Sequence, residues 1–217
     1  GFALLGMLII SGMSFFLMGR MNDMTSDIAT SWLPSVDVAR ELSATISDIR
    51  LNELGYLTAD SDNKEEASLQ SLQDGIKTMD ALLAAYGDMI DEEERNFYDN
   101  ANNLWTQYQA AEEEMMAFAK QGRSESARAI LDGECEALFN SLNSAFDEII
   151  DYNTKGSDDA AAESASLYRT ATLTMAAVVI AIILVGVFFS FVIIRLIKTP
   201  ISEIQNAAIK MAEGDLD

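Results

Sequence analysis

Apolar side chains recur at alternating intervals of three and four residues in four separate stretches of the chain. This spacing places them on one face of an α-helix, and it is typical of helices that pack nearly parallel to one another. No stretch alternates apolar and polar residues over the length of a strand. The pattern therefore predicts four packed helices. Their apolar stripes are Leu42, Ile46, Ile49 and Leu57; Leu69, Leu72, Ile76, Met79, Leu83, Tyr86 and Ile90; Phe97, Ala101, Leu104, Tyr108, Ala111, Met115 and Phe118; and Leu131, Cys135, Leu138, Leu142, Ala145, Ile149 and Tyr152.

Short polar segments separate the four stripes. ADSDN at 59–63 is rich in helix-capping residues, Asp91 is suited to cap the third helix, and QGRS at 121–124 offers a glycine stop followed by a serine start. Short connections require neighbouring helices to run antiparallel. The predicted fold class is therefore all-α, an antiparallel four-helix bundle with up-down-up-down topology.

Two uncharged apolar runs flank the predicted bundle, at 1–19 and 171–194. A helix of roughly 20 apolar residues is long enough to cross a bilayer. We therefore expect a first transmembrane helix at 1–19, a bundle domain at 20–170, a second transmembrane helix at 171–194 and a tail at 195–217. Pro34 is expected to kink the first bundle helix near its base, because proline removes a backbone donor.

Charge is concentrated between the two apolar runs. The chain has a net charge of −21, and residues 20–170 hold 31 acidic and 11 basic side chains. Arg195, Lys198 and Lys210 follow the second run, so the positive-inside rule places the tail in the cytoplasm and the acidic domain outside the membrane. So acidic a chain is not expected to bind nucleic acid. The EEE triplets at 92–94 and 112–114 are interpreted as solvated helix surface.

The reactive side chains are few, with one cysteine and no histidine. An intrachain disulfide and histidine-containing zinc or haem sites are thereby excluded. Cys135 falls on an apolar stripe, which favours a small buried side chain. The sequence predicts no catalytic residues, no metal site and no cofactor.

Arg50 and Glu53 project from the apolar face of the first bundle helix, or just beside it. A guanidinium there needs a carboxylate, which it can hold with two parallel hydrogen bonds. Three interpretations stay open: Arg50 pairs with Glu53 inside the bundle, contacts an anionic ligand, or pairs across a dimer. Tyr108, expected in the core with a local partner for its hydroxyl, lies at the same level, and Arg128 lies slightly nearer the end. The candidate ligand-binding residues on these grounds are Arg50, Glu53 and Tyr108.

The tail KTPISEIQNAAIKMAEGDLD carries a short heptad seam. Pro200 is placed to start a helix, and a lone helix of this length cannot bury its own seam. We expect the same segment of a second chain to cover it, which predicts a homodimer. The alternative, a helix lying on lipid, suits an acidic segment poorly. The seam residues are Ile201, Ile204, Ala208 and Met211.

The order of these segments resembles the bacterial methyl-accepting chemotaxis receptors. Pro200, the heptad seam and the closing EGDL at 213–216 are similar to the first helix of a HAMP domain. WLPS at 32–35 and DIRLNEL at 48–54 look like the four-helix-bundle ligand-binding module of these receptors. YNTKGSDDAAAESASLY at 152–168 resembles the segment that leads into their second membrane span.

This resemblance implies a homodimeric chemotaxis receptor in the bacterial inner membrane, with a periplasmic bundle. A small solute, an organic acid or amino acid, would bind at the membrane-distal end. The signal would pass through the second span and HAMP to a cytoplasmic kinase and its coupling protein. Arg50 matches the position of family arginines that hold ligand carboxylates, with Arg128 as a counterpart. The alternative is a sensor histidine kinase or nucleotide cyclase with the same input.

Overall fold

A computed structural model of the chain describes residues 2–198, 200, 201 and 205. Within these residues the chain is helical and contains no strand, which confirms the all-α class. The chain divides into two compact units. One is Met24–Ala162, and the other combines Gly1–Asp23 with Glu163–Asp217.

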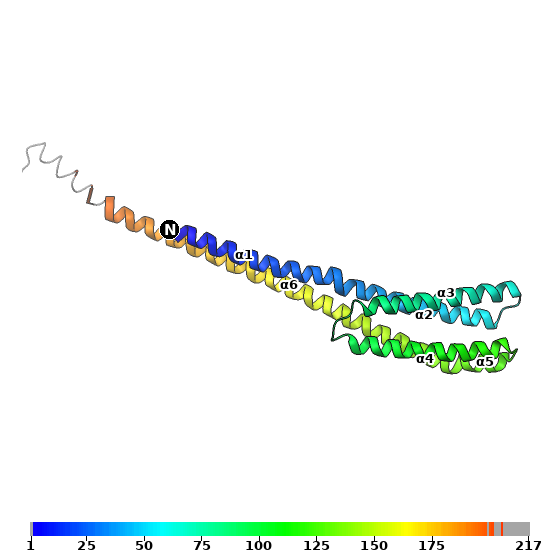
Figure 1. Cartoon of the computed structure of the whole chain (residues 1–217). Coiled ribbons are helices and arrows are strands. Elements are labelled where there is room, and N and C mark those ends of the chain that lie inside the picture. The colour runs from blue at the N-terminus through cyan, green and yellow to red at the C-terminus, as the bar shows by residue number, and fades with distance from the viewer. Residues whose placement is uncertain (1, 199, 202–204, 206–217) are drawn as a thin grey trace, which may run out of the picture. The chain divides into compact units, whose positions relative to one another are not determined.

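The unit Met24–Ala162 is an antiparallel four-helix bundle whose helices lie side by side (Figure 1). Successive helices run in opposite directions because each pair is joined by a short connection. The fourth helix of the bundle is one continuous helical run, in which a π-helical turn separates two α-helical segments. In chain order the elements are α2 (Leu33–Leu57), α3 (Asp62–Gly87), α4 (Arg95–Lys120), α5 (Ser124–Ile130), η2 (Leu131–Cys135) and α6 (Glu136–Ile193).

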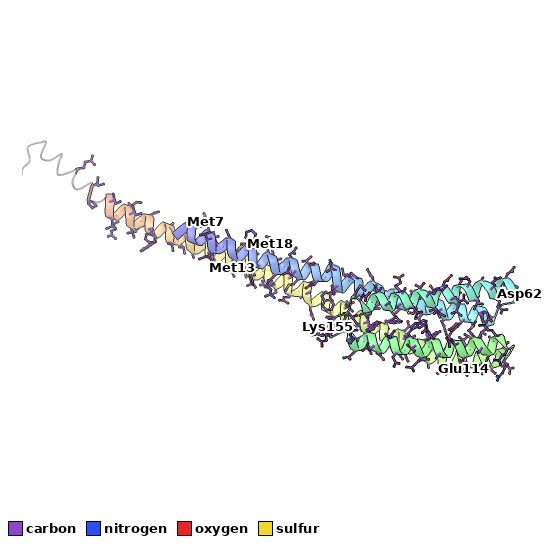
Figure 2. All side chains as sticks on the ribbon, viewed as in Figure 1. Met7, Met13, Met18, Asp62, Glu114 and Lys155 are labelled. Atoms are coloured by element: carbon purple, nitrogen blue, oxygen red, sulfur yellow. The ribbon has the colours of Figure 1, made fainter. Side chains whose placement is uncertain are left out.

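We call the bundle end with the connections 58–61 and 121–123 the tip, and the end with the connection 88–94 the base. Figure 2 shows Asp62 at the tip and Lys155 toward the base. Gly122 ends α4 with φ of 72°, a conformation that L side chains adopt poorly, and α5 begins at Ser124 as the sequence predicts. At the base, Asp91 Oδ1 accepts hydrogen bonds from the backbone N–H groups of Glu93 and Glu94, directly before α4.

The bundle core is built from the predicted stripes, because one face of each helix is turned toward the other three. The stripe residues are buried or half-buried in every helix, and ten of them, from all four helices, are 0% exposed. Burial of these apolar side chains is the main force that holds the bundle together. The ten are Leu42, Ile46, Ile49, Met79, Tyr86, Ala101, Tyr108, Met115, Cys135 and Leu142.

Two π-helical turns interrupt the helices of the bundle. In η1 (Ile28–Trp32) the closing bond runs from the Leu33 N–H to the Ile28 carbonyl, just before Pro34. A widened turn therefore lies on the N-terminal side of Pro34, and the kink expected at Pro34 stays a prediction. The second turn, η2, lies between α5 and α6 and ends at the buried Cys135.

The second unit contains most of α1 (Phe2–Asp27) and the later part of α6. These two segments pack against each other: Ser14 Oγ lies 3.5 Å from Met175 Sδ, and Arg20 pairs with Glu163 at 3.2 Å. Large apolar side chains such as Phe15 are exposed. Among the described residues, one continuous helical run, Ser124–Ile197, is long and apolar enough to cross a membrane.

The described part of the tail begins with η3 (Ile194–Lys198). Most of the predicted HAMP helix, including Ile204, Ala208, Met211 and the EGDL at 213–216, lies outside the described residues. The predicted domain bounds at 19, 170 and 194 stay predictions.

Candidate functional site

A buried polar cluster lies in the half of the bundle nearer the tip. Arg50 and Glu53 come from α2, where a spacing of three residues places both on one side of the helix. Tyr108 comes from the middle of α4, and Cys135 closes the π-turn η2. The structure therefore brings three of the four predicted ligand-binding residues together.

Glu53 is the centre of this cluster, and its side chain is 0% exposed. The Tyr108 hydroxyl donates a hydrogen bond of 2.8 Å to Glu53 Oε2, which is the local partner expected for that hydroxyl. Arg50 Nη1 lies 3.5 Å from the same oxygen. The other carboxyl oxygen, Oε1, is buried without a hydrogen-bond partner in the described part of the chain.

Arg50 lies between two carboxylates. Its Nη1 faces Glu53, and its Nη2 lies 3.8 Å from Glu136 Oε2 at the start of α6. The Arg50 side chain is 19% exposed, so the guanidinium reaches from the core to the edge of the bundle. The pairing of Arg50 with Glu53 is confirmed, and Glu136 is a partner that the sequence did not reveal. Contact of Arg50 with a ligand stays a prediction.

Burial controls the acid–base properties of this cluster. Loss of hydration raises the pKa of Glu53 to about 7, while the Tyr108 hydrogen bond and the Arg50 charge lower it and Glu112 raises it. Burial and the charge of Glu53 raise the pKa of the Tyr108 hydroxyl. Burial, with Glu53, also raises the pKa of the Cys135 thiol to about 12, so this thiol is protonated and unreactive near neutral pH.

Two neighbouring side chains hold the Tyr108 ring in place. The Trp105 ring stacks on Tyr108 with centroids 5.8 Å apart and 16° between the planes. The Trp105 indole Nε1–H donates to Asp80 Oδ1 on α3 at 2.7 Å. Trp105 is 3% exposed, although it lies one residue beyond the apolar stripe identified in the sequence.

Arg128 lies apart from the buried cluster, in a groove at the tip. Its Nε lies 2.6 Å from Asp132 Oδ2 in an exposed pair. The groove has a volume of about 490 Å³ and opens to solvent. It is lined by Leu57, Ser124, Glu125, Arg128, Ala129 and Asp132.

A second buried polar cluster at the base corrects one prediction. Glu94 is 3% exposed, and its Oε1 accepts hydrogen bonds from the Tyr86 hydroxyl at 2.7 Å and from Asn153 Nδ2. Glu112, in the other EEE triplet, is 8% exposed. The interpretation of both triplets as solvated surface is therefore wrong for these two residues. Partners from α3 and α6 make burial of Glu94 possible, and a run of acids does not reveal them.

Within the described residues, no group of three or more histidine, cysteine or acidic side chains is placed to hold a metal ion. The cluster around Glu53 contains an arginine, a carboxyl, a phenol and a protonated thiol. These groups are suited to exchange ion pairs and to bind or release a proton.

Comparison with known proteins identifies relatives of the chain. Residues 1–168 match the family model described as a four helix bundle sensory module for signal transduction. Two curated relatives carry the name "Putative sensory transducer protein". One, from Acetivibrio thermocellus, is 24% identical over 78% of this chain and 30% of its own length. The other, YvaQ of Bacillus subtilis, is 22% identical over 96% of this chain and 37% of its own length.

The chain spans about a third of the length of these relatives. The family match covers the bundle, the helix α1 that precedes it and the part of α6 up to residue 168. It therefore agrees with both the topology and the order of the elements. The chain belongs to the family of four-helix-bundle sensory modules for signal transduction.

Proposed function

We propose that this chain is the sensory input of a transmembrane chemotaxis receptor of the methyl-accepting type. The bundle senses a small solute outside the membrane, in the periplasm, and the second membrane span passes the signal inward. The family of the bundle and the names of its relatives support a receptor over an enzyme with the same input.

The observation that carries this proposal is the continuity of the last bundle helix. The helical run Ser124–Ile197 begins beside Arg128 at the tip of the bundle and includes the apolar segment suited to a membrane. A helix transmits a rotation or an axial displacement along its length because its backbone hydrogen bonds keep it stiff. Binding at the tip can therefore act on this helix directly.

The solute class proposed is a carboxylate. The exposed Arg128 in the tip groove is paired with Asp132. The carboxylate of a solute can take the place of the Asp132 carboxylate, because both carry the same charge. Arg50, with its 19% exposed side chain, exchanges partners in the same way with Glu136. Glu53 and Tyr108 act beneath the surface by holding Arg50 in position.

The remaining parts of the proposal come from the resemblance to chemotaxis receptors. They are assembly as a homodimer, two membrane spans in the bacterial inner membrane, a HAMP domain that begins at Pro200, and control of a cytoplasmic kinase through a coupling protein. The packing of α1 against the apolar part of α6 supports two spans.

A thermal-shift screen of the full chain in lipid nanodiscs tests the ligand class. We expect at least one organic acid or amino acid to raise the melting temperature, and Arg128→Ala to remove most of that increase. Arg50→Ala should weaken it. Arg40→Ala is the matched control, because Arg40 lies exposed on α2 and its ion pair with Asp37 is long, at 4.0 Å. Equal shifts in all four proteins would overturn the assignment of these arginines.

A further inference from the structure

The carboxyl of Glu53 occupies an unusual position for a charged group. It is fully enclosed, although it belongs to a bundle with an acidic surface. One oxygen has the Tyr108 hydroxyl as a donor, and the other has no partner in the described part of the chain. Arg50 Nη1, the nearest cationic atom, also lacks a hydrogen bond there, at 3.5 Å from the carboxylate.

An ionised carboxylate in this position is incompletely compensated. Removing a carboxylate from water is strongly unfavourable unless several close hydrogen bonds or a well-placed cation replace the hydration. A protonated carboxyl carries no net charge and needs far less compensation. The loss of hydration therefore favours the neutral form, whereas the Tyr108 hydrogen bond and the Arg50 charge favour the ionised form.

The groups around Glu53 oppose one another. On its own helix Arg50 favours the ionised form, and on α4 Tyr108 does the same, while Glu112 disfavours it. From η2 the protonated Cys135 faces the cluster, and from α6 Glu136 competes for Arg50. α3 contributes the apolar Leu72 and Ile76 beside Glu112. The resulting balance leaves the pKa of Glu53 at about 7.

We propose that Glu53 is a proton-binding site inside the bundle, through which the chain senses pH as an input separate from the solute. The carboxyl takes its proton from solvent and returns it there, and the edge of the cluster at Arg50 connects the core with solvent. The coupling of this site to an output rests on the proposed receptor function, whereas proton binding itself does not.

Arg50 converts the protonation state into a difference in helix packing. When Glu53 is ionised, Arg50 has carboxylates on both sides, at 3.5 Å on α2 and 3.8 Å on α6. When Glu53 is neutral, Glu136 is the one of these two carboxyl groups that still carries a negative charge. Acidification therefore strengthens the link between α2 and α6 relative to the contact inside α2. α6 is the helix that continues into the apolar run.

Infrared difference spectroscopy of the full chain in lipid nanodiscs tests proton binding directly. Between pH 8 and pH 6 we expect the carbonyl band of a buried, protonated carboxylic acid to appear in the wild type and to be absent in Glu53→Gln. Glu112→Gln is the matched control, because Glu112 is a second buried acid with a raised pKa. This variant should keep the Glu53 band and move its midpoint to lower pH, since the charge of Glu112 raises the pKa of Glu53. An identical pH response in wild type and Glu53→Gln overturns the proposal.

Trp105 gives an independent optical readout, since its ring stacks on Tyr108. In a Trp32→Phe background Trp105 is the remaining tryptophan, and its fluorescence should titrate with the same midpoint as the infrared band.

Tyr108→Phe removes a hydrogen bond that favours the ionised form, so the infrared midpoint should move to higher pH. A downward or absent shift contradicts the assigned role of Tyr108. If no carboxylate raises the melting temperature in the solute screen, the proposed solute class fails, but the infrared and fluorescence titrations of Glu53 are not affected. The proposed solute class and the proton-binding site can therefore fail separately.

Discussion

At the scale of single residues, burial changes the role of charged side chains in this bundle. Glu53 and Glu114 are both glutamates on bundle helices, yet the first is enclosed and the second is exposed. Figure 2 labels Glu114 on α4. The difference comes from the neighbouring helices. Tyr108 and Arg50 surround Glu53 with a donor and a cation, so a carboxyl is retained in a core of mainly apolar side chains.

The stability of the bundle should depend on pH through Glu53. Its pKa of about 7 in the folded protein exceeds the ordinary value of 4.5, so protonation favours the folded state. This contribution is complete below about pH 4.5 and is lost as the pH rises through 7. From pH 5 to pH 8, wild type should lose roughly 2 to 3 kcal/mol more stability than Glu53→Gln.

Thermal unfolding of wild type and Glu53→Gln in nanodiscs at several pH values measures this difference. Glu114→Gln, which changes an exposed acid on α4, should follow the wild type at every pH. A pH dependence shared by wild type and Glu53→Gln would show that the exposed acids dominate and that Glu53 contributes nothing.

At the scale of elements, the sequence places helix boundaries well and helix type less well. Gly122 and Ser124 mark the connection between α4 and α5 as expected. The π-turn η2 was not expected, because the apolar stripe runs through Leu131 and Cys135 without a break. An inserted wide turn shifts the side chains that follow it, so its position depends on packing against the facing helices.

Two glycines near the tip should respond in opposite ways to substitution by alanine. Gly122 has a φ of 72°, which disfavours a side chain, so Gly122→Ala should destabilise the bundle by about 1 kcal/mol. Gly133 lies within the helical run, and nothing is within 4 Å of an added Cβ. Gly133→Ala should therefore stabilise the bundle by about 0.5 to 1 kcal/mol. Melting temperatures of the two variants in nanodiscs, compared with wild type, measure both effects, and two shifts of the same sign would contradict this account.

At the scale of the whole molecule, the chain joins two kinds of structure with different solvents. The bundle buries its apolar stripes internally and exposes charge, whereas the unit containing α1 and the later part of α6 exposes large apolar side chains. Such surfaces require a lipid environment or a partner. This division agrees with the concentration of acidic residues between the two apolar runs.

Reporter fusions test the proposed membrane topology. A reporter inserted beside Asp62, at the tip of the bundle, should be outside the membrane, and one fused after Asp217 should be in the cytoplasm. Activity of a compartment-specific pair, such as alkaline phosphatase and a fluorescent protein, distinguishes the two sides. Reporters on the same side would refute a signal that crosses the bilayer through α6.

The sequence alone determined the four helices, their apolar faces and their antiparallel order. These properties are local: a repeat of three and four residues fixes the buried face of a helix, and short connections fix the direction of the next one. Only the tertiary structure decided which charged residues enter the core. Glu53 accepts a hydrogen bond from Tyr108, and Glu94 accepts hydrogen bonds from Asn153 and from Tyr86. Tyr108 and Asn153 are distant in sequence from the acids that they contact, and Tyr86 lies on the preceding helix, so burial of these carboxyls depends on partners that the packed bundle brings together.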